Sequence, residues 1–201
     1  MTSPRSAGRG RPPAASRELL QEAAFELFVE NGYTGTTVDQ IATRAGVSRN
    51  TFFNYFEAKG DVFWVELDSA TERLKAAIAH RAGADQAGAE TDAALTIRRA
   101  VLAAVAPLES HHVPFVLTQY DLIGSATELQ ASAMSRFATQ ARLLSGYLER
   151  TGATSATARA QAYSLIACVI AAAQEWANAG PQRGRLEPYV QRAIDAALIA
   201  E

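Results

Sequence analysis

The sequence predicts an all-α protein in which an N-terminal three-helix domain with a helix-turn-helix precedes a larger C-terminal helical bundle, about nine helices in all. Three observations carry this prediction. Apolar residues recur at the 3.6-residue spacing of an α-helix along nearly the whole chain. Strand signals are nearly absent, because apolar and polar residues nowhere alternate for long and no Asn-Gly or Asp-Gly turn lies between two alternating segments. Turn residues separate the helical segments, among them Pro107, Gly124 and Gly152.

Composition and charge narrow the class of protein. The chain has 201 residues, of which 48% are hydrophobic, so it can bury a core. No apolar stretch reaches the roughly 20 residues that cross a bilayer, and the N-terminus lacks the apolar region of a secretory signal. A single cysteine, Cys168, excludes an intramolecular disulfide, and we expect a cytoplasmic protein. The net charge is −2, yet residues 1–17 hold four arginines and no acid, which indicates a localised anionic partner.

Local signals define the first three helices. Each has a side chain that can cap its N-terminus, and these are Ser16, Thr37 and Ser48. Gln40 lies three residues after Thr37 and completes a capping-box pattern. The first helix is expected to end at Asn31-Gly32, and Gly46 is expected at a sharp turn with positive φ before a third helix that runs to about Tyr55.

The C-terminal bundle is expected to begin with a long helix that starts at Lys59 and ends in the small-residue segment 81–90. Further helices are expected over residues 91–106, 112–124, 127–151, 155–179 and 186–200.

Residues 37–56 contain two short helices joined at a glycine, which is the geometry of a helix-turn-helix. Ile41, Phe52 and Phe56 supply the buried side of this motif, so the polar side chains of the second helix are left to face outward. Those polar side chains are Arg49, Asn50, Asn54 and Tyr55. Arginine can bind guanine and asparagine can bind adenine, each worth roughly 1–3 kcal/mol of base discrimination. Short hydroxyls suit phosphate oxygens, and the motif offers Thr37, Ser48 and Thr51.

Residues 16–64 resemble the DNA-binding domain of the TetR family of transcriptional regulators. The resemblance lies in the run "AAFELFVENGYTGTTVDQIATRAGVS", then "TFFNYF", then Lys59. It implies a homodimer that binds double-stranded DNA at a palindromic operator. It also implies a C-terminal domain that binds a small molecule, an unidentified effector, and thereby releases the DNA. The implied function is a sequence-specific regulator, foremost a repressor, and the alternative is an effector-independent DNA-binding regulator or an activator.

The resemblance also implies a domain plan and a set of DNA contacts. We expect a basic flexible arm at 1–15, a DNA-binding domain at 16–60 with its motif at about 37–56, and a ligand-binding and dimerisation domain at 61–201. Residues at positions where the family touches or approaches phosphate are Thr37, Ser48, Phe53, Asn54, Tyr55 and Lys59. Residues at positions where bases are commonly read are Arg49, Asn50 and Thr51. Arg44 is also expected at the DNA.

Three positions depart from the family pattern. Phe53 stands where a tyrosine hydroxyl usually meets phosphate, and Asn50 often replaces a glycine. Ala58 stands where a capping residue is common, and Gly60 weakens the same helix start, so we expect a pliable beginning for the fourth helix. In the N-terminal arm, Arg9 and Arg11 are expected either to enter an A·T-rich minor groove or to belong to a solubilising tail.

Aromatic and polar residues of the C-terminal half are expected either to pack the core or to line a cavity for an apolar or amphipathic ligand. The candidate pocket residues are Phe115, Gln119, Tyr120, Met134, Phe137, Tyr163, Gln174 and Trp176. No metal site or cofactor is expected, because His111 and His112 are adjacent and no Cys, Asp or Glu completes a ligand set. Cys168 lies in an apolar run and is expected to be an inert buried thiol, with a redox sensor as the alternative.

Two C-terminal helices carry small, flat faces. These faces consist of Ala160, Ala167, Ala171 and Ala172 in one helix and Ala193, Ala196 and Ala197 in the other. The resemblance implies that they pair across a twofold axis in a dimer, and the alternative is that they complete the core of one chain. An enzyme is not expected, because the sequence contains no HExxH, GxSxG, P-loop or Cys-x-x-Cys motif.

Overall fold

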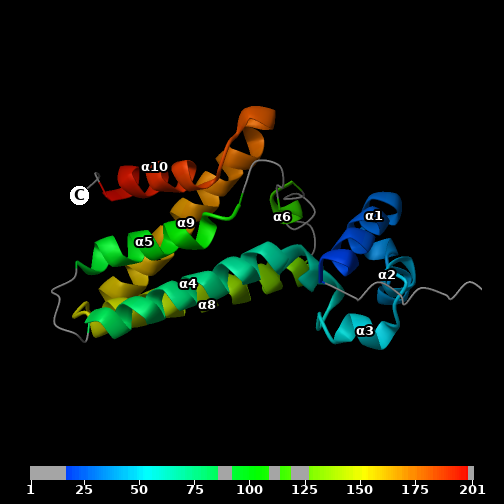
Figure 1. Ribbon diagram of the computed structural model, residues 1–201, viewed down its shortest axis with the longest axis horizontal. Coiled ribbons are helices and arrows are strands. Elements are labelled where there is room, and N and C mark those ends of the chain that lie inside the picture. Colours follow the sequence, from blue (N-terminus) through cyan, green and yellow to red (C-terminus); the bar gives the residue numbers. More distant parts are fainter. Residues whose placement is uncertain (1–16, 86–91, 109–113, 119–126, 199–201) are drawn as a thin grey trace, which may run out of the picture. The chain divides into compact units, whose positions relative to one another are not determined.

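The computed structural model describes residues 17–85, 92–108, 114–118 and 127–198 (Figure 1). Every regular element within these ranges is helical and none is a strand, which confirms the all-α prediction. The chain divides into two compact units, Met1–Val62 and Phe63–Glu201. The sequence placed this boundary between residues 60 and 61.

The first unit consists of short helices: α1 (Arg17–Gly35), α2 (Val38–Arg44), α3 (Arg49–Phe53) and the beginning of the 3₁₀ helix η1 (Lys59–Trp64). The expected end of the first helix is a kink instead, because Gly32 adopts a positive φ of 71° and one further turn follows it to Gly35. The unit closes around a core in which Leu20, Ile41 and Phe52 are 0% exposed. Its apolar residues therefore lie on the faces that the helical spacing indicates.

The predicted caps at Thr37 and Ser48 and the predicted turn at Gly46 are confirmed. Thr37 Oγ1 accepts the backbone N–H of Gln40 at 3.3 Å, and Gln40 Oε1 accepts the N–H of Thr37 at 2.8 Å. Ser48 Oγ accepts the N–H of Thr51 at 3.1 Å, which starts α3. Gly46 has a φ of 70°, a conformation that strains any residue with a Cβ atom. These contacts fix the direction in which α3 leaves the corner.

The second unit contains the remaining helices. They are α4 (Val65–Asp85), α5 (Ala93–Val105), α6 (Phe115–Thr118), α8 (Thr127–Arg150), α9 (Ser155–Asn178), the 3₁₀ helix η2 (Gly180–Gln182) and α10 (Glu187–Leu198). Of these, α4, α8 and α9 are the longest. α8 and α10 pack along α9, and α5 packs along α4 (Figure 1). The core contains Ile97, Leu144, Tyr147, Trp176 and Ile194, each at most 2% exposed.

The fourth helix starts differently from the prediction. The sequence predicts an α-helix from Lys59, whereas η1 comes first and the α-helix begins at Val65. Gly60 and the lack of a capping side chain at Ala58 both disfavour an immediate α-helical start. Asp61 partly compensates, because its Oδ2 accepts the backbone N–H of Ala58 at 2.8 Å.

α9 is the most unusual helix of the second unit. Its length and composition alone would allow it to cross a membrane. Core helices of soluble proteins can have the same length and composition. One face packs inward through Ala162, Ile166 and Trp176. The opposite face is exposed in the single chain, and it carries the small residues Ala167 and Ala171 together with polar residues such as Ser164 and Glu175.

Candidate nucleic-acid interface and ligand cavity

The short helix α3 has one buried face and one exposed face. Phe52 is fully buried, and its ring packs against Phe56 with centroids 5.4 Å apart. Arg49, Asn50 and Asn54 all lie on the exposed face. The structure therefore brings together, at the surface, the side chains that the sequence predicts to read DNA bases. Helices of this kind lie in the major groove of duplex DNA in helix-turn-helix proteins.

Arg49 is held in place by two neighbours. Its Nη1 atom lies 2.6 Å from Asp39 Oδ2, and its guanidinium carbon lies 5.3 Å from the centroid of the Phe53 ring. Phe53, which cannot donate to a phosphate, is 43% exposed and supports this arginine instead. The sequence contains no signal for the Asp39 contact, because the two residues come from different helices.

Two hydroxyl side chains of the motif, those of Thr37 and Ser48, cap the N-termini of α2 and α3. Ser48 Oγ and Thr51 Oγ1 lie 2.8 Å apart, in addition to the bond from the Thr51 backbone. Thr37 and Ser48 are exposed at the starts of α2 and α3, while Thr51 and Tyr55 are half-buried. Their predicted contacts with phosphate remain predictions.

Lys59 has backbone partners inside the first unit. Its Nζ atom donates to the carbonyl oxygens of Tyr33 at 2.7 Å and Thr36 at 2.9 Å, and it lies 4.1 Å from the centroid of the Tyr33 ring. This half-buried ammonium group fastens the start of η1 to the end of α1. Any contact of Lys59 with phosphate must be compatible with these bonds.

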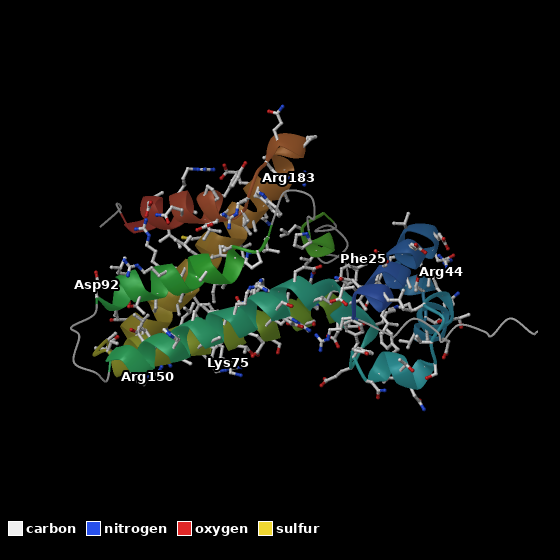
Figure 2. The ribbon with its side chains drawn as sticks, in the orientation of Figure 1. Phe25, Arg44, Lys75, Asp92, Arg150 and Arg183 are labelled. Carbon is white, nitrogen blue, oxygen red and sulfur yellow. The ribbon has the colours of Figure 1, made fainter. Side chains whose placement is uncertain are left out.

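Arg44 joins α2 to α1 (Figure 2 labels it). Its Nη1 lies 2.9 Å from Glu26 Oε2, and its Nη2 lies 2.7 Å from Glu30 Oε2. The hydrogen bond from Arg44 lowers the pKa of the Glu30 carboxyl below its ordinary value. The same hydrogen bond raises the pKa of Arg44, with a second contribution from Glu26. Two carboxylates therefore compensate the positive charge of Arg44.

Some predicted DNA contacts lie outside the described residues. They are Arg9 and Arg11 of the basic arm. The expected helix cap Ser16 also lies outside the described residues.

The second unit contains a partly open cavity of about 530 Å³ between α4, α5, α6, α8 and α9. Its walls are predominantly apolar, and three of the predicted pocket residues line it: Met134, Phe137 and Gln174. The structure places two other candidates elsewhere, because Tyr163 is 50% exposed and Trp176 is buried with its Nε1 donating to Gly184 O at 2.9 Å. The side chain of Phe115 and the residues Gln119 and Tyr120 lie outside the described part of the chain.

Several wall residues have no distinguishing signal in the sequence. The aliphatic side chains that line the cavity from α4, α5, α8 and α9 include Leu67, Leu74, Val101, Leu144 and Ile166. The helical spacing marks them only as inward-facing, and a filled core requires the same spacing. Trp64, at the end of η1, also lines the cavity.

The sequence also made expectations for Cys168 and for metal binding. Cys168, expected to be buried, is half-buried on α9. Among the residues with described positions, no group of three or more His, Cys, Asp or Glu side chains could hold a metal ion. His111 and His112 lie outside those residues.

A helix-turn-helix unit followed by a hollow helical bundle defines the class of ligand-binding, DNA-binding regulators. The family model for bacterial regulatory proteins of the tetR family matches residues 20–63. The model of the MftR C-terminal domain matches residues 91–198. The chain belongs to the TetR family of transcriptional regulators, which confirms the resemblance and makes the protein a DNA-binding transcriptional regulator. This is a family of regulators and not of enzymes.

Two relatives align with most of the chain. MftR of Mycobacterium tuberculosis, named as a candidate transcriptional regulator of mycofactocin biosynthesis, is 22% identical over 173 residues, which are 83% of this chain and 82% of MftR. The transcriptional activator FasR of Mycolicibacterium smegmatis is 28% identical over 176 residues, covering 85% of this chain and 76% of FasR.

Solved structures share the fold. FadR of Thermus thermophilus, a TetR family repressor in complex with lauroyl-CoA, superposes with a TM-score of 0.54 and 24% identity, covering 91% of this chain and 93% of FadR. A transcriptional regulator from Pseudomonas aeruginosa gives a TM-score of 0.57 at 20% identity, covering 95% of each chain. At these identities the likeness concerns the fold.

Proposed function

We propose that this protein is a cytoplasmic homodimer that binds a palindromic operator through α3 and releases it when an apolar small molecule fills the cavity of the second unit. One observation carries the DNA-binding part. Arg49, Asn50 and Asn54 are exposed on a helix whose other face is buried through Phe52. Exposed arginine and asparagine on such a helix match the hydrogen-bonding edges of guanine and adenine.

Dimerisation is supported by α9 and α10. Ala160, Ala167 and Ala171 are exposed on α9, and Ala196 is exposed on α10, so small side chains form surfaces that another helix can approach closely. Ala172 is 1% exposed and belongs to the core of the single chain. Of the four alanines named on α9, Ala172 thus packs in the core of the single chain, and the other three are exposed and support the proposed pairing with a partner helix. Half-sites one turn of DNA apart require two recognition helices about 34–36 Å apart, and a symmetric dimer supplies two such helices.

The effector is proposed to be largely apolar. A volume of about 530 Å³ falls within the range of roughly 300–1,000 Å³ that is usual for ligand pockets. The lauroyl-CoA bound to FadR of Thermus thermophilus supports an acyl chain as one kind of occupant. A ligand of this kind shifts an equilibrium only through its different affinities for the DNA-binding and the released states. We propose that it acts by moving α4 and so changing the separation of the two recognition helices.

The alternative is a regulator that activates transcription or needs no effector. The name of FasR, a transcriptional activator, favours activation as a specific second candidate.

A selection of bound fragments from random DNA tests the proposal and supplies the operator. We expect a palindromic sequence, and Arg49→Ala should relax the base preference at one or two positions of each half-site. Fluorescence anisotropy with that operator then measures release by small molecules. A preferred sequence that Arg49→Ala leaves intact would refute the role of Arg49 in reading bases, and selection of a non-palindromic site would refute the symmetric dimer.

A further inference from the structure

We infer that Gln174 is the polar anchor of the cavity, and that the ligand is an apolar chain with a carbonyl group that hydrogen-bonds to the Gln174 amide. This inference rests on the proposed function, because it specifies the chemistry of a ligand for the same cavity.

The polar groups on the cavity wall are few, and most of them are already engaged. They are Glu66, Gln130, Gln140 and Gln174. Gln140 Nε2 donates to Thr71 Oγ1 at 2.8 Å, and Thr71 Oγ1 donates in turn to Leu67 O at 2.8 Å. Glu66 and Gln130 also interact with other groups of the protein. Within the described part of the chain, the half-buried amide of Gln174 is left without a protein partner.

The indole N–H of Trp64 is a weaker candidate. This residue lines the cavity and its Nε1 atom has no hydrogen-bond partner, but the atom itself is buried, so a ligand would reach it only after the ring turned. The ring is held in place by Arg136, whose guanidinium carbon lies 5.4 Å from the ring centroid. Two hydrogen bonds to Asp68, at 2.8 and 3.1 Å, hold that arginine. Within the described residues, Gln174 is therefore the cavity-lining amide whose two N–H donors are both left for a ligand.

The remaining walls determine the chemistry of the ligand. A carbonyl buried among aliphatic side chains without a hydrogen bond loses its hydration and gains nothing in return. An amide offers two N–H donors and one carbonyl acceptor, so Gln174 can donate to a ligand carbonyl. A pure hydrocarbon in the same cavity would cover the amide and leave it unpaired. The cavity should therefore prefer a chain with a carbonyl over the same chain without one, whether the carbonyl belongs to a ketone or to an acyl thioester.

A thermodynamic cycle on the full-length protein tests the anchor. The probes are 2-tridecanone and tridecane, with lauroyl-CoA as a third arm that separates a free carbonyl compound from an acyl thioester. Each is measured by displacement of the apolar dye N-phenyl-1-naphthylamine. Since one hydrogen bond contributes about 0.5–1.5 kcal/mol net, wild-type protein should prefer the ketone to the hydrocarbon by about 2- to 10-fold. Gln174→Met, which keeps the length of the side chain, should abolish this preference and tighten the binding of tridecane, because the hydrocarbon then no longer covers an unpaired amide.

Controls separate the anchor from a general effect on the cavity. Gln140→Leu removes another amide from the same wall, and it should keep the ketone preference because the Gln140 amide already has a protein partner. Gln174→Ala gives a second test at the same position, and thermal unfolding verifies that each variant is folded. A ketone preference that survives in both Gln174 variants, or one that Gln140→Leu removes, would overturn the inference.

The outcomes also separate the inference from the proposed function. A ketone preference that depends on Gln174 supports the anchor even where operator DNA stays bound, and in that case only the proposed release fails. Release of DNA by tridecane and 2-tridecanone at equal occupancy, with no preference between them, supports the effector site and overturns the anchor. Wild-type protein that binds neither the dye nor any of the probes overturns both.

Discussion

Replacement of Asp39 by asparagine should tighten DNA binding, because it frees Arg49. In the structure Arg49 Nη1 lies 2.6 Å from Asp39 Oδ2, and both side chains are more than half exposed. Arg49 must give up this carboxylate before its guanidinium can take a base edge or a phosphate. The Asp39→Asn variant would keep the shape of the side chain and remove the charge that competes with DNA.

The size of the effect follows from the exposure of the pair. An exposed ion pair contributes about 0.2–1 kcal/mol, which corresponds to about 1.4- to 5-fold in affinity for one copy of Arg49. Two protomers on one operator double this to about 0.4–2 kcal/mol, or about 2- to 30-fold. The variant has a cost in stability, because Asp39 lies in the first turn of α2, where a negative charge favours the helix by about 0.3–1 kcal/mol.

Fluorescence anisotropy with a selected operator and with a scrambled duplex, each at several salt concentrations, measures the gain. Glu22→Gln is the matched control, since it removes an exposed carboxylate from the same unit that pairs with neither Arg44 nor Arg49 among the described residues. The decisive comparison adds Asp39→Asn to Arg49→Ala, where no arginine remains to be freed. A gain of equal size in that background, or in Glu22→Gln, would refute the argument, because the effect would then come from net charge alone.

Three further predictions concern the first unit and the start of the bundle. Lys59→Met removes two charge-assisted hydrogen bonds to backbone carbonyls, so it should lower the free energy of unfolding by about 1.5–3 kcal/mol in denaturant titrations, as well as weaken binding to all DNA sequences alike. Ala58→Ser should add the missing half of a capping box, because Asp61 already accepts the N–H of residue 58. The added cap should stabilise the fold by about 0.5–1 kcal/mol and weaken the response to effector. An unchanged response would contradict a pliable hinge at this point. Because the pKa of Glu30 is lowered, its bond to Arg44 stabilises the fold fully at pH values above the ordinary pKa of 4.5. This stabilisation is lost as the pH falls through the lowered pKa. Glu30→Gln should therefore remove part of the acid-induced loss of stability.

The N-terminal unit could be predicted closely from the sequence because its signals are local. The capping pair of Thr37 and Gln40 and the positive φ of Gly46 each depend on residues within one turn of chain, and both are confirmed. The start of the fourth helix was predicted less well. Gly60 and the missing cap at Ala58 disfavour an immediate α-helical start, while Asp61 Oδ2 accepts the Ala58 N–H and partly compensates. Helical spacing alone does not reveal this balance.

The ligand cavity could be predicted only in part, for a physical reason. Apolar residues at helical spacing face inward whether the interior is filled or hollow, so Phe137 of the cavity and Trp176 of the core have equivalent patterns. What distinguishes them is the distance between helices, which depends on all the side chains of the bundle together. Gln174 differs, because a polar residue on the otherwise apolar inward face of a helix indicates by itself that the interior contains a polar partner or a ligand.

The basic residues of the first unit differ in how readily they can turn to DNA, and the structure ranks them. Arg44 shares two carboxylates, and Lys59 is half-buried with two carbonyl oxygens that would lose their partner if it left. Arg49 has one exposed carboxylate, which water can solvate once the arginine departs. Exchange of a protein partner for a DNA partner is therefore least costly for Arg49. Residues with the same charge therefore differ in the free-energy cost of turning to DNA. Base reading should depend on Arg49 more than on Arg44 or Lys59.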